Sequence, residues 1–331
     1  MDDLDRRLLS LVQEDFPIDE RPYLRLAERL GCTEDDVIAH LAALVEQGVI
    51  RDVSPVFDLR LLGYSSTLAA LDVPPDRIEE VAALINARPE VTHNYLREGH
   101  PNLWFTVIAE SPDAVQRTIS SVERESGSSP VHNLPATRMF KARVVFDLGD
   151  AEPTKPSGGA EWGPHGAPTG PAVDAAHWPA IEQLQEGIPL TSRPYDQLAE
   201  RAGMPVADFL DCARLLKGSG IIRRMGVRLR HHRAGVRGNI LSVWRVPEEE
   251  VERVGLAFAG LPEVTHCYSR PTFEGFPYNL YAMVSAPTPE AAEATLHRMS
   301  DTSGVREWVA LKTGRELKKS TPRYRRPSRP A

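Results

Sequence analysis

RPYLRLAER at residues 21–29 returns as RPYDQLAER at residues 193–201, an offset of 172 residues. Two further stretches keep this register with one net insertion: GVIR at 48–51 returns as GIIR at 220–223, and PEVTH at 89–93 returns at 262–266. A register that holds over so long a stretch is typical of internal duplication. The sequence therefore predicts two tandem copies of one domain.

A segment rich in glycine and proline separates the two copies. Residues 149–177 contain six Gly and five Pro without apolar periodicity, which predicts a flexible linker. The predicted organisation is a helix-turn-helix domain and a ferredoxin-like domain in copy one, the linker, the same pair in copy two, and a basic tail: 1–62, 63–148, 149–177, 178–234, 235–315 and 316–331.

Length and composition fit a folded protein of two domains. The chain has 331 residues, of which 41% are hydrophobic and 26% charged. Three widely spaced cysteines form neither a zinc ribbon nor a disulfide scaffold, and the acidic start MDDLDRRLLS does not resemble a signal peptide. No apolar run is long enough to span a membrane. We expect a cytoplasmic protein without a membrane partner.

Charge is distributed unevenly along the chain. The last 20 residues carry eight bases and one acid, so the remainder of a chain with net charge −7 holds a net charge of −14. An acidic body is unfavourable for a general nucleic-acid binder. The basic tail is predicted to be a solvated end or, alternatively, an arm that contacts anions.

The first 60 residues of each copy have the apolar spacing of three short helices. Gly31 lies between the second and third helices, Thr33 is a candidate N-cap, and Gly48 is a candidate C-cap. An extended segment at 53–61 follows, and then strands and helices in the order βαββαβ: 66–73, 76–87, 91–96, 103–109, 113–126 and 138–146. The predicted fold class is α+β, a tandem duplication of helix-turn-helix plus ferredoxin-like sheet.

This architecture, with LAERLG at 26–31, resembles the Lrp/AsnC regulators, which bind DNA. The expected recognition helix at 33–47 contains four acids and no Lys or Arg, and its counterpart at 205–217 is neutral. A recognition helix needs bases to approach phosphates. We therefore predict no nucleic-acid partner, and we keep a ligand-responsive DNA-binding regulator as an alternative.

A more specific resemblance lies in the later motifs of both copies. GIIRRMG at 220–226, HCYSRP at 266–271 and PYNLY at 277–281 resemble sirohaem decarboxylases, as do VTHNYLR at 91–97 and NLWF at 102–105 in copy one. The resemblance implies two fused subunits that remove CO2 from two acetate side chains of sirohaem to give 12,18-didecarboxysirohaem, for haem d1 or alternative haem biosynthesis.

Several expectations follow from that resemblance. The enzyme would be a carboxy-lyase whose partner is sirohaem, and it would need no cofactor because the iron belongs to the substrate. The two copies would associate as a pseudo-heterodimer within the chain, which could pair further as a homodimer. A tetrapyrrole carrier without turnover is a further alternative.

The residues themselves indicate a site. His93 and His266 hold one repeat position, and each precedes a Tyr by two residues and an Arg by four: Tyr95 and Arg97, Tyr268 and Arg270. In an extended segment all three side chains of a set share one face. Copy two adds a longer aromatic connection that includes Tyr278 and precedes Asn279, which suits a flat macrocycle. Copy two is therefore the preferred main site.

Copy two also carries a basic strand. Alternation places Arg224, Arg228, Arg230 and His232 on one face, where copy one has mixed charges. Unpaired like charges repel, and a polyanion such as sirohaem would relieve that repulsion.

The chemistry assigns roles to these residues as hypotheses. His266 and Tyr268 are assigned to proton transfer, and His231, on the family resemblance, to proton transfer or ligation of the substrate iron. Strand alternation favours His232 over His231, and we leave that choice open. No resident metal is expected, and the predicted substrate-binding residues are Arg223, Arg224, Arg228, His232, Arg270, Tyr278, Asn279, His93, Tyr95 and Arg97.

Overall fold

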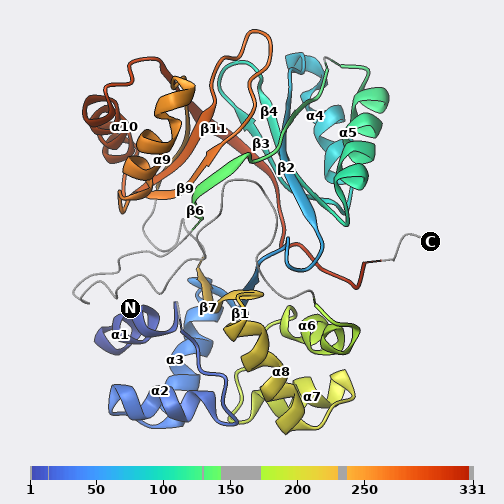
Figure 1. Ribbon diagram of the computed structural model, residues 1–331. Coiled ribbons are helices and arrows are strands. Elements are labelled where there is room, and N and C mark those ends of the chain that lie inside the picture. The colour runs from blue at the N-terminus through green and yellow to red at the C-terminus, as the bar shows by residue number, and fades with distance from the viewer. Residues whose placement is uncertain (1, 14, 129, 143–172, 230–236, 328–331) are drawn as a thin grey trace.

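The computed structural model describes residues 2–13, 15–128, 130–142, 173–229 and 237–327. Each copy begins with three helices, as predicted (Figure 1). A short 3-10 turn, Ala175–His177, precedes those of copy two. The helices are α1 Asp3–Val12, α2 Pro22–Leu30, α3 Glu34–Glu46, α6 Trp178–Leu184, α7 Pro194–Ala202 and α8 Val206–Gly218.

Local sequence explains the turn of each helix-turn-helix. Gly31 (φ 72°) and Gly203 (φ 66°) end α2 and α7 in the left-handed conformation that glycine adopts most readily. Thr33 caps α3 by accepting from the N–H of Asp36, whose carboxylate accepts from Thr33 in return. The predicted cap residue is confirmed.

The two helical units pack as one body. The Tyr23 hydroxyl donates to the Pro189 carbonyl (2.7 Å), and the Tyr195 hydroxyl donates to the Pro17 carbonyl (3.1 Å), so each copy binds the other at the equivalent place. Strands β1 (Ile50–Phe57) and β7 (Ile222–Leu229) join the units as an antiparallel ribbon. One hydrophobic core runs through both units.

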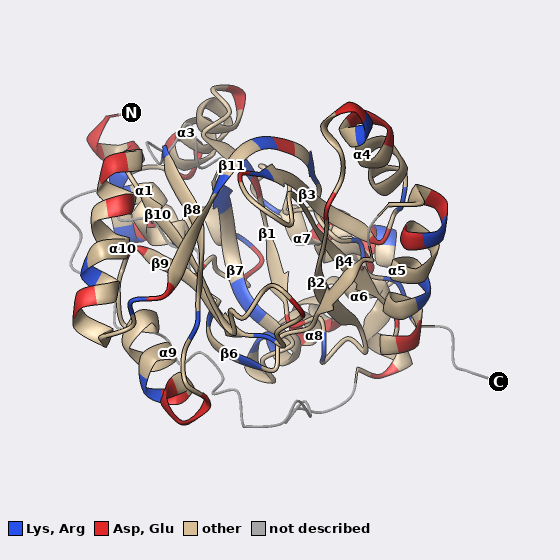
Figure 2. Cartoon of the chain, turned by 90° about the horizontal axis from the view of Figure 1, so that it is seen from above, with Lys and Arg blue, Asp and Glu red and all other residues tan. Residues whose placement is uncertain are grey.

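The remaining strands form one nine-stranded sheet in the order β5-β2-β4-β3-β11-β8-β10-β9-β6. Helices α4 and α5 cover the copy-one half, and α9 and α10 cover the copy-two half (Figures 1 and 2). The α+β class, with a helical unit and a helix-covered sheet in each copy, is confirmed. The elements are β2 Ser65–Leu71, α4 Ile78–Asn86, β3 Val91–Arg97, β4 Leu103–Ala109, α5 Pro112–Ser126, β5 His132–Leu134, β6 Arg138–Ala142, β8 Gly238–Trp244, α9 Val251–Ala259, β9 Val264–Ser269, β10 Leu280–Ala286, α10 Pro289–Ser303 and β11 Trp308–Lys319.

The last strand of each copy crosses to the other copy. We expected residues 138–146 to complete the sheet of copy one, but β6 pairs with β9 of copy two, and the short β5 takes the expected place beside β2. Strand β11 pairs with its own β8 through 308–312 and then with β3 of copy one through 313–319. Pro135 follows β5 and cannot donate to a ladder, which explains why copy one divides this strand in two.

The crossing strands make the sheet enclose an interior. Strands β5 and β6 stand at opposite ends of the sheet, yet only residues 135–137 separate them in the chain. The sheet must therefore curl until its two ends meet. Leu241, Val243 and Leu311 of copy two and Ala70 and Trp104 of copy one belong to one buried cluster inside this curl.

The basic tail is anchored to the rest of the protein over its described part, while its Arg323, Arg325 and Arg326 side chains are exposed. Residues 316–319 belong to β11, and Tyr324 beyond it is 6% exposed. Its ring lies 5.1 Å from that of Tyr64, and its main chain bonds the Gln185 side chain of the helical unit. Burial of the large Tyr324 ring stabilises this attachment. Residues 328–331 and most of the predicted linker, 149–172, lie outside the described residues.

None of the described helices has the length and apolar character that crossing a membrane requires.

Candidate functional site

A cavity of about 780 Å³ is lined by residues of both copies, from strands of the nine-stranded sheet, from residues 57–60 at and after the end of β1, and from Arg223 of β7. Its volume is in the range of sites that hold small molecules and cofactors. Strands β3 and β4 of copy one and β9 and β10 of copy two contribute to its wall, and the C-terminal segment adds Lys319 and Pro322. The two copies therefore share one cavity.

Both His-x-Tyr-x-Arg sets line this cavity: His93, Tyr95 and Arg97 on β3, and His266 and Tyr268 on β9 with Arg270 directly after it. The prediction that each set shares one strand face is confirmed. The ring centres of His93 and Tyr95 are 6.2 Å apart, and those of His266 and Tyr268 are 6.1 Å apart. Each arginine lies 5.1 Å from the ring of its own tyrosine. The two sets thus have closely matching geometry.

The histidines are oriented by the preceding threonines. Nδ1 of His93 is 2.9 Å from the Thr92 hydroxyl, and Nδ1 of His266 is 3.1 Å from the Thr265 hydroxyl. Burial and, to a smaller extent, the positive charge of Lys319 lower the pKa of His93 to about 4. The imidazole of His93 is therefore neutral near pH 7, the form that accepts a proton or ligates a metal.

Each arginine of the two sets is held by the other copy. Arg97 donates to the Leu311 carbonyl and the Thr313 hydroxyl, both at 3.0 Å, and Arg270 donates to the Leu134 carbonyl. Within the described chain, Nε of each arginine is buried without a hydrogen-bond partner. Burial lowers the pKa of Arg97 to about 10, so Arg97 stays charged at neutral pH, and burial also lowers the pKa of Arg270. Their unused donors can bind an anion in the cavity.

The tyrosines remain protonated donors. Burial, with the nearby Glu316, raises the pKa of Tyr95 to about 12, and burial raises that of Tyr268. An imidazole, a phenol and a guanidinium therefore line each half of the cavity. This combination can bind carboxylates and move a proton.

The basic strand only partly reaches this site. Arg223 lines the cavity, and its guanidinium donates to the Ala142 carbonyl at 3.3 Å. Arg224 and Arg228 are not among its lining residues. The expectation that these arginines repel one another without partners is wrong, because Arg228 makes two bonds to Asp52 (2.5 and 2.6 Å) and Arg224 donates to the Gln13 carbonyl at 3.0 Å.

Two other predicted residues lie away from the cavity wall. Both polar atoms of the Asn279 side chain bond the main chain of Val246 (2.8 and 2.9 Å), and the ring of Tyr278 packs against Phe276. These contacts indicate that Asn279 and Tyr278 stabilise the packing of the copy-two sheet. His231 and His232 lie outside the described residues.

Tyr281 and Lys319 are among the wall residues that were not singled out from the sequence. Tyr281 is 1% exposed on β10, and Lys319 is the cross-strand neighbour of His93 at the end of β11. Tyr281 could have been found, because its motif NLY at 279–281 repeats NLW at 102–104. Lys319 could not have been found, because nothing in the sequence shows that β11 crosses to copy one.

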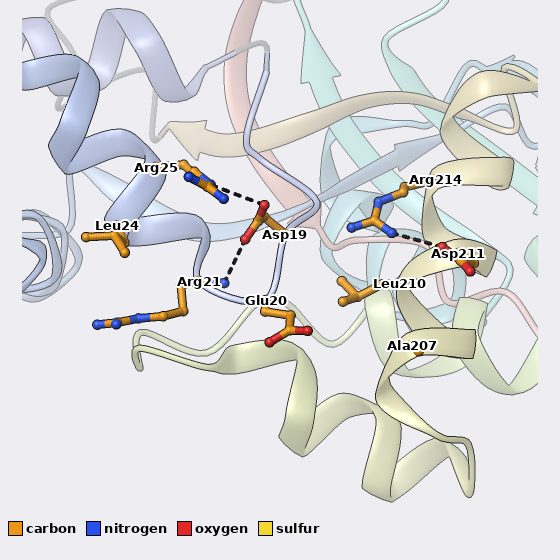
Figure 3. Close-up of a pocket in the computed structure, with 9 residues that line it drawn as sticks. All are labelled: Asp19, Glu20, Arg21, Leu24, Arg25, Ala207, Leu210, Asp211 and Arg214. Carbon is orange, nitrogen blue, oxygen red and sulfur yellow. Dashed lines mark hydrogen bonds and ion pairs between the residues drawn. The ribbon is translucent and has the colours of Figure 1, made fainter.

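A second, shallower cavity of about 430 Å³ lies between the loop before α2 and helix α8 (Figure 3). Its charges are already paired: Asp19 accepts from Arg25, and Asp211 accepts from Arg214. The main chain of Ile18 accepts a further bond from Arg214. Because its described charges satisfy one another, we do not assign this cavity a ligand.

Comparison with known proteins places this architecture in a family. The models described as "AsnC-like ligand binding domain" and "Siroheme decarboxylase NirDL-like HTH domain" each match twice, the first at 61–141 and 233–318 and the second at 5–51 and 180–223. Each copy therefore contains both domains of the family.

Individual relatives agree with this match. A siroheme decarboxylase of Hydrogenobacter thermophilus is 34% identical over 96% of this chain and 94% of its own. A siroheme decarboxylase alpha subunit of Nitratidesulfovibrio vulgaris is 46% identical over 45% of this chain and 84% of its own. The crystal structure of the siroheme decarboxylase NirDL with an iron-uroporphyrin III analogue superposes with a TM-score of 0.74, at 28% identity over 97% of this chain and 94% of that one. With this similarity over nearly all of both chains, the protein belongs to the sirohaem decarboxylase family.

Proposed function

We propose that this chain removes CO2 from two acetate side chains of sirohaem and releases 12,18-didecarboxysirohaem, an intermediate for haem d1 or alternative haem biosynthesis. One observation carries the proposal: two matching His-Tyr-Arg sets face one cavity. A single macrocycle in that cavity can present one acetate to each set. The two copies then act as fused subunits of one enzyme.

The reaction needs a carboxylate held in place and a proton delivered after CO2 leaves. The bond between the acetate methylene and its carboxylate carbon breaks, and its electron pair stays on the methylene carbon, delocalised into the ring. One proton then converts the methylene to a methyl group. The iron is part of the substrate, and this scheme requires no separate cofactor.

The residues of the cavity divide this work. Arg97, Arg270 and Arg223 bind carboxylates, because the first two have unused buried donors and Arg223 faces the cavity. His266 and Tyr268 transfer the proton in the copy-two half, and His93 and Tyr95 do so in the copy-one half. The resemblance keeps His231 as a further candidate for proton transfer or iron ligation.

Anaerobic incubation of the purified protein with sirohaem, followed by mass spectrometry, tests the activity. We expect successive losses of one and two CO2. Sirohaem binding without a change in mass would instead identify a tetrapyrrole carrier, and salt-sensitive binding to duplex DNA would identify a regulator.

Single histidine variants test the division of work. His266→Ala should slow the release of one CO2 by about two to four orders of magnitude, the range typical of a general acid or base, while sirohaem still binds. His93→Ala should slow the release of the other CO2. Each variant should therefore accumulate a different singly decarboxylated product, which chromatography separates. If one variant abolishes both losses and the other neither, a single set does all the chemistry.

A further inference from the structure

The buried hydroxyl of Tyr281 has no hydrogen-bond partner in the described part of the chain. Tyr281 is 1% exposed, lines the shared cavity, and pairs across the sheet with Tyr268 of β9. The Arg270 guanidinium lies 5.6 Å from the centre of its ring, and Nε of Arg270 also lacks a partner there. Two polar groups at the copy-two wall thus have unused hydrogen-bonding capacity.

Copy one has a different residue at the position equivalent to Tyr281. Trp104 occupies it, because Trp104 lies two residues after Asn102 just as Tyr281 lies two residues after Asn279. The side chains of both asparagines bond the main chain of a valine in the same way. The indole N–H of Trp104 donates to the Pro101 carbonyl at 2.7 Å. The polar group at this position is therefore satisfied in copy one and unsatisfied in copy two.

An unsatisfied buried hydroxyl lowers the stability of the folded protein, because it has lost its bonds to water without replacing them. Phenylalanine would place the same ring against the same neighbours without that cost. The ring alone therefore does not account for tyrosine here. A ligand that accepts a hydrogen bond inside the cavity does account for it.

We propose that the Tyr281 hydroxyl and the Arg270 Nε–H together form a carboxylate subsite in the copy-two half of the cavity. The ligand is a side-chain carboxylate of the bound tetrapyrrole, which accepts one bond from each group. This inference rests on the proposed function, because it takes the tetrapyrrole as the ligand. Since Trp104 offers no such donor, the subsite makes the two halves bind their carboxylates unequally and so orients a substrate that is itself asymmetric.

Tyr281→Phe in the full chain tests the subsite through two opposite effects. Without ligand, the variant should unfold at the same or a higher urea concentration than the parent protein, because an unsatisfied group has been removed. With iron-uroporphyrin as the probe, spectral titration should give a Kd about tenfold to a hundredfold higher, the loss expected for a hydrogen bond to a charged group. An unchanged Kd would overturn the inference.

Tyr195→Phe is the matched control, because the Tyr195 hydroxyl is buried but donates to Pro17 in the helical unit. Its removal should lower the urea midpoint and leave the Kd for iron-uroporphyrin unchanged. If Tyr195→Phe weakens binding as much as Tyr281→Phe, the effect is general destabilisation and the subsite is refuted.

A double-mutant cycle tests whether Tyr281 and Arg270 share one carboxylate. Arg270→Lys keeps the charge but removes Nε–H, so it should also raise the Kd. In the double variant the increase should be smaller than the product of the two single increases, since the second change removes a contact already weakened. Independent effects would refute the shared carboxylate.

Binding and turnover separate this inference from the proposed function. If the parent protein binds iron-uroporphyrin through Tyr281 but releases no CO2 from sirohaem, the subsite stands and the proposed reaction fails. If the parent protein decarboxylates sirohaem and Tyr281→Phe binds and reacts identically, the reaction stands and the subsite fails. If the parent protein does not bind iron-uroporphyrin, the subsite fails.

Discussion

His93 and His266 hold the same place in the repeat but face different cross-strand neighbours. Lys319 of β11 lies opposite His93, and Ala142 of β6 lies opposite His266. The other copy supplies both neighbours, so the crossing strands give equivalent histidines different electrostatic surroundings. The sequence predicted the histidines and their shared strand face, but it could not predict these neighbours.

The lowered pKa of His93 predicts a specific dependence of stability on pH. Its pKa is about 6.5 in the unfolded chain and about 4 in the folded protein, where burial, Lys319 and Arg51 oppose its charge more than Glu316 favours it. Between those pH values the unfolded chain takes up a proton that the folded protein does not. Stability is therefore complete above about pH 6.5 and falls as the pH approaches 4, by up to about 3 kcal/mol for this group.

Urea unfolding of the parent protein and His93→Gln at pH 7 and pH 4.5 measures this effect. Other groups titrate equally in both proteins, so the difference between the two losses isolates His93. The parent should lose about 2 to 3 kcal/mol more than the variant. Equal losses would show that His93 titrates normally in the folded protein.

The sequence predicts the positions of helices and strands better than it predicts which strands pair with one another. Apolar periodicity placed the helices of both copies, and the predicted strand at 103–109 matches β4. Periodicity shows which strand face is buried but not which strand lies alongside. The partners of β6, β7 and β11 are set by packing between copies. For this reason the sequence misplaced the last strands and did not predict the partners of Arg224 and Arg228 on β7.

The pairing of β1 with β7 gives Arg228 a structural role. Asp52 lies opposite Arg228 in the ribbon, both side chains are about three-quarters buried, and Arg228 also donates to Thr321 of the C-terminal segment (2.8 Å). Arg228→Ala should therefore lower the unfolding free energy by about 1 to 3 kcal/mol, because it leaves the Asp52 carboxylate without its main partner. Urea denaturation measures the loss.

The Asp52→Ala/Arg228→Ala double variant is the control for that prediction. Its loss of stability should be smaller than the sum of the two single losses, because neither charge is left behind alone. Spectral titration of Arg228→Ala with iron-uroporphyrin should give the Kd of the parent protein. A weaker titration with unchanged stability would restore the earlier assignment of Arg228 to substrate binding.

Strand pairing between the two copies holds them together in addition to the covalent chain. Strand β6 completes the copy-two sheet, the second half of β11 completes the copy-one sheet, and β1 pairs with β7. Tyr23 and Tyr195 add reciprocal bonds between the helical units. The sequence predicted the duplication and the association of the copies, but not that each copy is incomplete without the other.

This mutual completion predicts that the chain can be divided without loss of function. Cutting between Gly158 and Gly159, within the predicted linker, and co-expressing the halves should yield a one-to-one complex that binds iron-uroporphyrin and decarboxylates sirohaem. A covalent linker only raises the effective concentration of one half near the other, and the paired strands here supply the contacts themselves.

Ending the second half at Lys312 keeps the pairing of β11 with β8 but removes its pairing with β3, so this shortened half should associate weakly or not at all. Size-exclusion chromatography with mass analysis distinguishes the complexes. If the shortened half associates as well as the full one, the crossing strand does not hold the copies together, and the helical units and the β1–β7 ribbon carry the association.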